Sequence, residues 1–341
     1  MPANLTPDYK AAEAAFRKAR DPGERLEHLR EMLRLIPKHK GTDHLQAEIK
    51  KRIKELTSEP AGPSATGART GPATYIASEG AAQVALLGPP NSGKSALHVA
   101  LTGSRSEVGP YPFTTQFPQP GMYVFDDIAF QLVDLPPISR EHPIPWIVNA
   151  LQPADACLLV VDLGEPDCVD LVIAVHAVLE GRRVALTGNW PADRAVEEQS
   201  TGNDLSALTI TLPTLLVATK SDLHPDSNEE LQILEELAGF SYPALAVSAD
   251  TGAGLARIGS WLADKLEIVR VYTKIPGQSA EMTHPFTVRH GQTVADVAGL
   301  VHREMSESIK YARIWGRDSF AGQQVGRDHV VSDGDVLELH T

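Results

Sequence analysis

Apolar and polar positions follow different periods along the chain. In residues 1–58, apolar residues recur every three or four positions on otherwise charged segments, as in amphipathic helices. We expect helices over residues 9–20, 24–36 and 42–56. Residues 59–78 have no period and are rich in Gly, Pro, Ser, Thr and Ala, which is typical of a flexible linker.

Residues 79–272 alternate short apolar runs with helical patterns. This alternation predicts an α/β domain with an open, mostly parallel sheet and one antiparallel strand. The segment 183–212 is polar, and the pattern places no element in it. The expected strands are 83–87, 122–125, 128–133, 156–161, 213–218 and 244–247, and the expected helices lie near 94–102, 168–182, 228–238 and 254–268.

The pattern changes again in residues 273–341. A short strand over 286–288 precedes a helix over 293–306, and further strands are expected at 312–315 and 336–339. The third region is therefore predicted to be a small α+β module.

An eight-residue loop between the strand 83–87 and the helix 94–102 carries the strongest chemical pattern. It fits G-x-x-x-x-G-K-[ST], in which backbone N–H groups and a helix N-terminus surround phosphate oxygens. Lys94 would reach the terminal phosphates, and the Ser95 hydroxyl would bind Mg²⁺. An ordinary glycine-rich turn is the alternative. The expected contact residues are Gly88, Pro89, Pro90, Asn91, Ser92, Gly93, Lys94, Ser95 and Ala96.

Two further motifs could complete a magnesium site. Thr115, in Tyr-Pro-Phe-Thr-Thr at 111–115, lies in a glycine-flanked loop that can close on Mg²⁺ and the γ-phosphate. Asp134 follows the expected strand 128–133 and can hold Mg²⁺ through water. Each motif is weak alone, and the prediction depends on their order and on their position at one sheet edge.

Two other strand ends predict recognition of guanine. Thr219-Lys220-Ser221-Asp222 follows the strand 213–218, and its Asp222 carboxylate can accept hydrogen bonds from guanine N1–H and N2–H₂. Adenine offers no such pair of donors. Lys220 would lie over the base and brace the phosphate loop. After the strand 244–247, Ser248-Ala249 places the Ala249 N–H where it can bond guanine O6.

These motifs resemble the Obg/DRG branch of translation-factor-class GTPases. The resemblance rests on the asparagine in the phosphate loop, on residues 111–115 and on Asp134-Leu135-Pro136. Residues 36–47 are similar to the helical segment before the G domain of DRG-like members. Residues 284–338 look like a TGS domain, a ubiquitin-like β-grasp module.

The resemblance implies slow GTP hydrolysis with Mg²⁺ and a role around ribosomes or RNA, reached through the N-terminal helices and the TGS-like module. It assigns phosphate and Mg²⁺ binding to Lys94 and Ser95, and the switch threonine to Thr115. Asn91 matches an asparagine that helps bind K⁺ in some relatives, where the ion supplies positive charge during hydrolysis.

Three positions depart from the family pattern. Pro137 stands where the family has glycine, so the usual N–H bond to the γ-phosphate cannot form. Thr219 replaces an asparagine. Ile138 stands where many GTPases keep a water-orienting glutamine, and an apolar residue there is also usual in the Obg/DRG branch. The second switch is also shortened, because residues 143–146 follow within a few positions. A slow switch and a guanine-nucleotide-binding scaffold with little turnover both fit. An ATPase is disfavoured by Asp222.

Charge and composition limit the other functions. The formal net charge of −13 comes from the middle of the chain at −14, with +4 in residues 1–58 and −3 in residues 281–341. Bulk nucleic-acid binding is therefore disfavoured, and only the N-terminal segment is locally basic. The two cysteines fit neither a disulfide framework nor a zinc site. No apolar run could span a bilayer and no signal peptide is visible, so we expect a cytoplasmic protein without a membrane partner.

Overall fold

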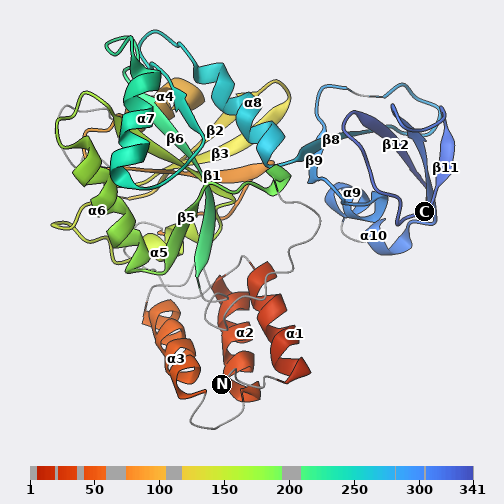
Figure 1. Cartoon of the computed structure of the whole chain (residues 1–341). Coiled ribbons are helices and arrows are strands. Elements are labelled where there is room, and N and C mark those ends of the chain that lie inside the picture. Colours follow the sequence, from red (N-terminus) through yellow and green to blue (C-terminus); the bar gives the residue numbers. More distant parts are fainter. Residues whose placement is uncertain are drawn as a thin grey trace.

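The computed structural model describes residues 6–19, 22–36, 42–58, 74–104, 117–193, 209–280, 282–302 and 305–340. Figure 1 shows a sheet domain with a helical segment below it and a separate β-rich module to its side. This architecture confirms the predicted fold class. The predicted switch segment with Thr115, and most of the predicted linker, lie outside the described residues.

The N-terminal helices form a small core of their own. Tyr9, Phe16, Leu29 and Ile49 are fully buried among them, which is the apolar stripe that the sequence predicted. The Glu48 carboxylate pairs with Arg183 of the sheet domain at 2.6 Å, so this segment contacts the sheet domain beside β5. The helices are α1 (Pro7–Lys18), α2 (Pro22–Leu35) and α3 (Asp43–Ser58).

The central sheet has the strand order β2-β3-β1-β4-β6-β5, and β7 also pairs with β6. Among its described strands only β2 and β3 pair in antiparallel fashion, which confirms the one antiparallel strand that was predicted. In the segment that the pattern left open, the structure places β5 and the beginning of β6. The strands are β1 (Ala82–Leu87), β2 (Gln119–Phe125), β3 (Ile128–Asp134), β4 (Ala156–Asp162), β5 (Val184–Thr187), β6 (Ile210–Thr219) and β7 (Ala244–Ala246).

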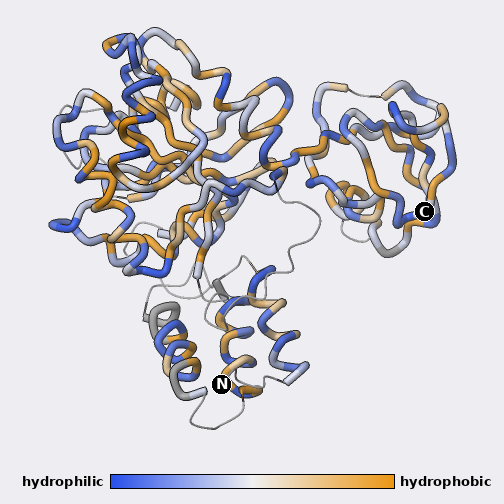
Figure 2. The backbone as a smooth tube through the Cα atoms, viewed as in Figure 1, coloured by the Kyte–Doolittle hydropathy of each residue, from blue (hydrophilic) through white to orange (hydrophobic). Residues whose placement is uncertain are grey.

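Helices cover both faces of this sheet (Figure 1), which explains the continuous apolar runs of its inner strands (Figure 2). One buried cluster joins the sheet to α5, α6 and α7, and the other joins it to α4 and α8. Trp190, before the short 3₁₀ helix η1, is fully buried edge-on to Trp261 of α8. The helices are α4 (Lys94–Thr102), α5 (Ile147–Leu151), α6 (Cys168–Glu180), η1 (Pro191–Asp193), α7 (Ser227–Ala238) and α8 (Leu255–Lys265).

The C-terminal module is a second sheet, in the order β11-β10-β12-β8-β9, with α9 packed on one face. Two of its strands, β8 and β11, were not predicted. Because β8 pairs with β9 and β12, the module begins at Ile268, not at residue 273 as expected. The elements are β8 (Ile268–Thr273), β9 (Phe286–Arg289), α9 (Val294–Val301), α10 (Met305–Ser308), β10 (Tyr311–Trp315), β11 (Gln323–Val325) and β12 (Asp335–His340).

Two helix predictions were also too long. The helix expected over 254–268 ends at Lys265, because Glu267 has a left-handed backbone (φ 52°) that turns the chain into β8. The helix expected over 293–306 is divided into α9 and α10, because His302 is extended (φ −157°, ψ 132°).

Candidate functional site

The predicted motifs meet at one edge of the central sheet. The loop 88–93 connects β1 to α4, Asp134 ends β3, and Thr219 ends β6. These strands are parallel, so their carboxyl ends lie together, and ligands bind at this edge in open α/β sheets.

The phosphate loop is held in a shape that its glycines allow. Gly88 has φ 151°, and a Cβ there would lie 2.2 Å from the Val160 carbonyl oxygen of β4. Gly93 has φ 85° and packs against Thr219 of β6. Asn91 is exposed and also left-handed, at φ 59°. The loop therefore approaches two neighbouring strands at distances that side chains would prevent.

Lys94 points back over this loop. Its ammonium donates hydrogen bonds to the carbonyl oxygens of Gly88, at 3.1 Å, and Pro89, at 2.8 Å. Burial lowers the pKa of Lys94 to about 8, and the nearby Asp134 carboxylate only partly opposes this effect. A bound phosphate would favour the charged ammonium. The Lys94 ammonium thus lies close to the position that the negatively charged phosphates of a ligand would occupy.

The lowered pKa predicts that nucleotide affinity depends on pH. Below about pH 8 the Lys94 ammonium is charged in the nucleotide-free protein, and above that pH binding must take up a proton. We expect the affinity for GDP to fall between pH 8 and pH 9, by up to about tenfold. Titration calorimetry at pH 8.5 in two buffers of different ionisation enthalpy measures the proton uptake. Constant affinity from pH 7 to pH 9, without uptake, would contradict the placement of Lys94.

Ser95 and Asp134 form a pair of oxygen donors beside the loop. The Ser95 hydroxyl donates to the fully buried Asp134 carboxylate at 2.6 Å. Mg²⁺ prefers oxygen ligands and usually shares them with substrate phosphates. Within the described residues, no group of three or more His, Cys, Asp or Glu side chains could hold a metal by itself. This pair therefore fits an ion that phosphate oxygens help to bind.

The guanine motif is attached directly to the phosphate loop. The buried Thr219 hydroxyl lies 2.8 Å from the Ser92 carbonyl oxygen and 3.1 Å from that of Val161. The bracing expected from Lys220 is thus made by Thr219. The Lys220 ammonium instead pairs with Asp162 at the end of β4, at 2.5 Å. Asp162 was missed in the sequence, although a carboxylate at the end of a buried strand was a usable signal.

The second base-binding segment is tied to the first. The Ser221 N–H donates to the Val247 carbonyl at 3.1 Å, and this bond joins the two loops that carry Asp222 and Ala249. Asp222 is exposed, so its carboxylate is accessible to a ligand. Ser248 is buried and its hydroxyl accepts the Thr251 N–H at 3.1 Å, so Ser248 shapes its loop from within.

The segment after Asp134 is packed into the domain. Residues 134–139 are all buried, and Ile138 lies in the core with Leu135 and Ile147. The Ile138 N–H donates to the Gly88 carbonyl at 3.0 Å. The backbone of Ile138 thus joins this buried segment to the phosphate loop.

Comparison with known proteins agrees with this arrangement. Residues 83–188 match the family model described as 50S ribosome-binding GTPase, and residues 269–341 match the TGS domain. An uncharacterized GTP-binding protein of Methanocaldococcus jannaschii is 26% identical, with 93% of this chain and 92% of the relative covered. Developmentally-regulated G-protein 1 of Arabidopsis thaliana is 24% identical, with 93% and 90% covered.

A solved structure has the same fold. The YchF GTPase of Schizosaccharomyces pombe superposes with a TM-score of 0.51 over 77% of this chain and 98% of that one, at 12% identity. In the part of the chain that the structure describes, every helix is too short or too polar to cross a membrane.

Proposed function

Since the chain is a P-loop GTPase of the Obg/DRG type with a C-terminal TGS domain, we propose that it binds GTP and GDP with Mg²⁺, hydrolyses GTP slowly and acts as a switch. The observation that supports this most strongly is the Thr219 hydroxyl, 2.8 Å from the Ser92 carbonyl. It makes the base-reading loop and the phosphate loop one unit, so base identity and phosphate number are sensed together.

Each site residue has a role in this proposal. Lys94 binds the terminal phosphates, and Ser95 and Asp134 hold Mg²⁺, which supplies positive charge to the phosphates when bound. Thr115 joins the metal site as the switch threonine. Asp222 accepts the guanine N1–H and N2–H₂, while Lys220 lies over the base. Backbone N–H groups of residues 88–96 surround the phosphates, and the loop at Ser248 and Ala249 contacts guanine O6.

Asn91 is proposed to help bind K⁺ near the phosphates. Its exposed side chain is on the phosphate loop, at a residue with a left-handed backbone. A monovalent cation there would supply the charge that an arginine provides in other phosphoryl-transfer sites.

The ribosome or another RNA is the proposed partner, and the cytoplasm the proposed location. The matching family model is described as a ribosome-binding GTPase. Residues 1–58 carry a charge of +4 in a chain of −13, so the N-terminal helices are the natural contact for phosphate groups, with the TGS domain as the second contact.

Release of phosphate from GTP tests the proposal. The full chain is incubated with GTP and Mg²⁺ in KCl and, separately, in NaCl of the same concentration. We expect slow release that is faster in KCl, and none without Mg²⁺. Equal rates in both salts would refute the role of Asn91 in K⁺ binding. No release in either salt, with GTP still bound, would refute the switch.

A nucleotide-binding scaffold with little turnover is the second candidate. It is favoured by the buried segment at Pro137 and Ile138, which lacks both the γ-phosphate N–H and a water-orienting side chain. The same phosphate measurement separates the two, because a scaffold retains GTP without releasing phosphate.

A further inference from the structure

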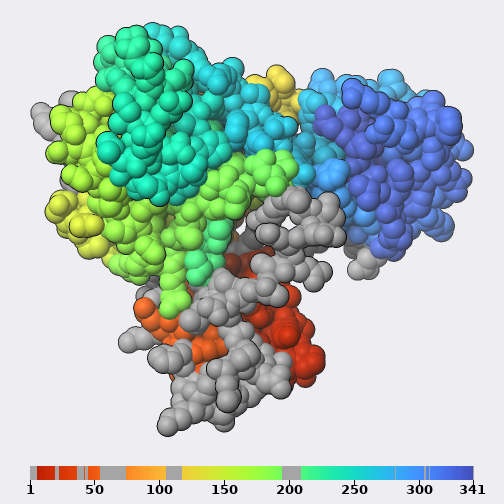
Figure 3. Space-filling view, viewed as in Figure 1, coloured from red at the N-terminus to blue at the C-terminus, as the bar shows by residue number. Residues whose placement is uncertain are grey.

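The β2–β3 hairpin connects the nucleotide site to the C-terminal module. At one end, β2 follows the predicted switch segment, and β3 ends at Asp134 of the magnesium site. At the other end, the hairpin turn carries Asp126 and Asp127 between Phe125 and Ile128. In Figure 3 the yellow hairpin reaches the C-terminal module beside α8.

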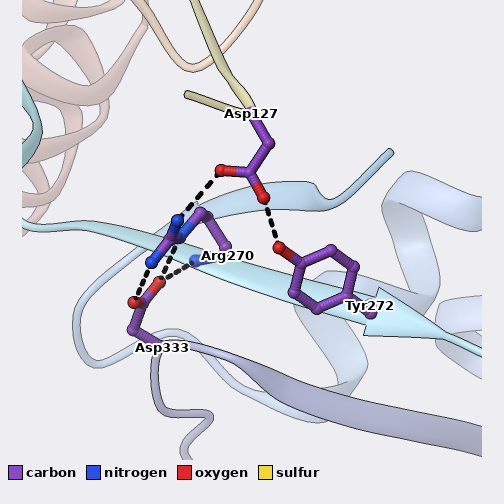
Figure 4. Close-up of polar contacts among 4 residues, drawn as sticks. All are labelled: Asp127, Arg270, Tyr272 and Asp333. Atoms are coloured by element: carbon purple, nitrogen blue, oxygen red, sulfur yellow. Dashed lines mark hydrogen bonds and ion pairs between the residues drawn. The ribbon is translucent and has the colours of Figure 1, made fainter. Parts of the chain in front are cut away.

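Asp127 binds two residues of β8, the first strand of that module (Figure 4). One carboxylate oxygen accepts a hydrogen bond from the Arg270 guanidinium at 3.0 Å, and the other accepts one from the Tyr272 hydroxyl. Burial alone would raise the pKa of Asp127, but these two donors outweigh it and hold the pKa below its usual value. The carboxylate therefore stays charged at neutral pH.

Arg270 is itself fixed within the module. Its guanidinium donates to both oxygens of Asp333, at 3.0 and 2.7 Å, and its backbone N–H donates to the same carboxylate at 2.8 Å. This fork geometry is specific for a carboxylate partner. Because Asp333 holds the Arg270 guanidinium and backbone in place, a displacement of Asp127 would affect the C-terminal module as a whole. It would not be absorbed by one flexible side chain.

The strand β2 also touches the helices that flank the nucleotide site and the module. A Cβ on Gly121 would lie 2.8 Å from the His98 ring of α4, the helix that begins at the phosphate loop. A Cβ on Gly259 of α8 would lie 2.3 Å from the Phe125 ring and 2.6 Å from the Tyr123 hydroxyl. The helix α8 leads directly into β8. Strand β2 thus packs closely against α4, which begins at the phosphate loop, and against α8, which precedes the C-terminal module.

We propose that the β2–β3 hairpin transmits the nucleotide state to the TGS domain through Asp127. This inference rests on the proposed function. The other segment that could report the γ-phosphate, residues 136–139, is buried and tied to Gly88. Among the described residues, the β2–β3 hairpin therefore connects the nucleotide site, at Asp134, to a second domain, at Asp127. The nucleotide sets the position of the hairpin, and the hairpin sets the contact of Asp127 with Arg270 and Tyr272.

Because coupling between two sites is reciprocal, cutting the contact must change nucleotide preference. Asp127→Ala removes the acceptor for both β8 residues without altering the nucleotide site. The ratio of affinities for a non-hydrolysable GTP analogue and GDP is measured with fluorescent nucleotides on the full chain. We expect the ratio to change by about fivefold or more. Asp193→Asn, which cuts the exposed ion pair to Lys265 within the sheet domain, is the matched control.

Hydrogen exchange gives the second measurement. In the natural protein, the amides of residues 268–273 should exchange at different rates with the GTP analogue and with GDP, and Asp127→Ala should abolish the difference. Tyr272→Phe removes a single hydrogen bond and should shift the affinity ratio in the same direction by less, which decides the matter if Asp127→Ala does not fold. An unchanged ratio in a folded variant would overturn the coupling. Absence of guanine nucleotide binding by the natural protein would overturn the proposed function instead.

Discussion

Lys94→Met is expected to lower the affinity for GDP and GTP about 100-fold or more, because a desolvated cation facing an anion contributes strongly to binding. The same change should leave the nucleotide-free protein at least as stable. Lys94 is 6% exposed, and burial lowers its pKa to about 8, so the fold bears a cost for holding this charge. Because the lowered pKa means that the charged form is disfavoured in the folded protein, an apolar side chain of similar length removes that cost.

Two measurements on one preparation check both halves of this prediction. Nucleotide titration gives the affinity, and thermal unfolding without nucleotide gives the stability. Lys265→Met removes an equal charge from a half-buried position on α8 and should keep the affinity of the natural protein. If Lys94→Met bound GDP normally, or unfolded at a much lower temperature, the assignment of Lys94 as a buried, phosphate-binding cation would be wrong.

Asp222→Asn is expected to weaken GTP binding about 100-fold or more and to improve binding of XTP. In the proposed site the carboxylate would accept two hydrogen bonds from guanine, and a hydrogen bond to a charged group contributes about 1.5 to 3 kcal/mol. Xanthine carries an oxygen where guanine carries its amino group. An amide can donate to that oxygen, whereas a carboxylate repels it.

Competition binding with GTP, XTP and ATP measures this reversal of preference. Asp226→Asn, four residues later and also exposed, changes the charge by the same amount and should behave as the natural protein. A uniform loss of affinity for all three nucleotides would mean that Asp222 shapes the loop and does not read the base.

The sequence predicted the parts of this molecule whose chemistry is local. The loop 88–95, its strand and its helix follow from a glycine pattern and apolar periods, and the structure places them as expected. The two strands on either side of Asp126-Asp127 were also predicted, because each is a short apolar run. Thr219, where the family has an asparagine, reaches the Ser92 carbonyl with its hydroxyl.

The parts that sequence reasoning missed depend on distant partners. Strand β8 follows α8 after two residues, and the expected helix extended to residue 268, its first position. Its strand character depends on pairing with β9 and β12. Strand β5, in the segment 183–212, was not predicted because it is only four residues long. It pairs with the first four residues of β6. The role of Asp127 was invisible because its partners, Arg270 and Tyr272, are more than 140 residues away along the chain.

Calorimetric titration of the purified full chain with GDP, a non-hydrolysable GTP analogue, ADP and an ATP analogue in Mg²⁺ tests the central claim most directly. The arrangement of Asp222, Thr219 and the phosphate loop predicts binding of both guanine nucleotides, with the adenine nucleotides weaker by about 100-fold or more. Equal affinity for guanine and adenine nucleotides, or binding of neither, would contradict the assignment of this sheet edge as a guanine-nucleotide site.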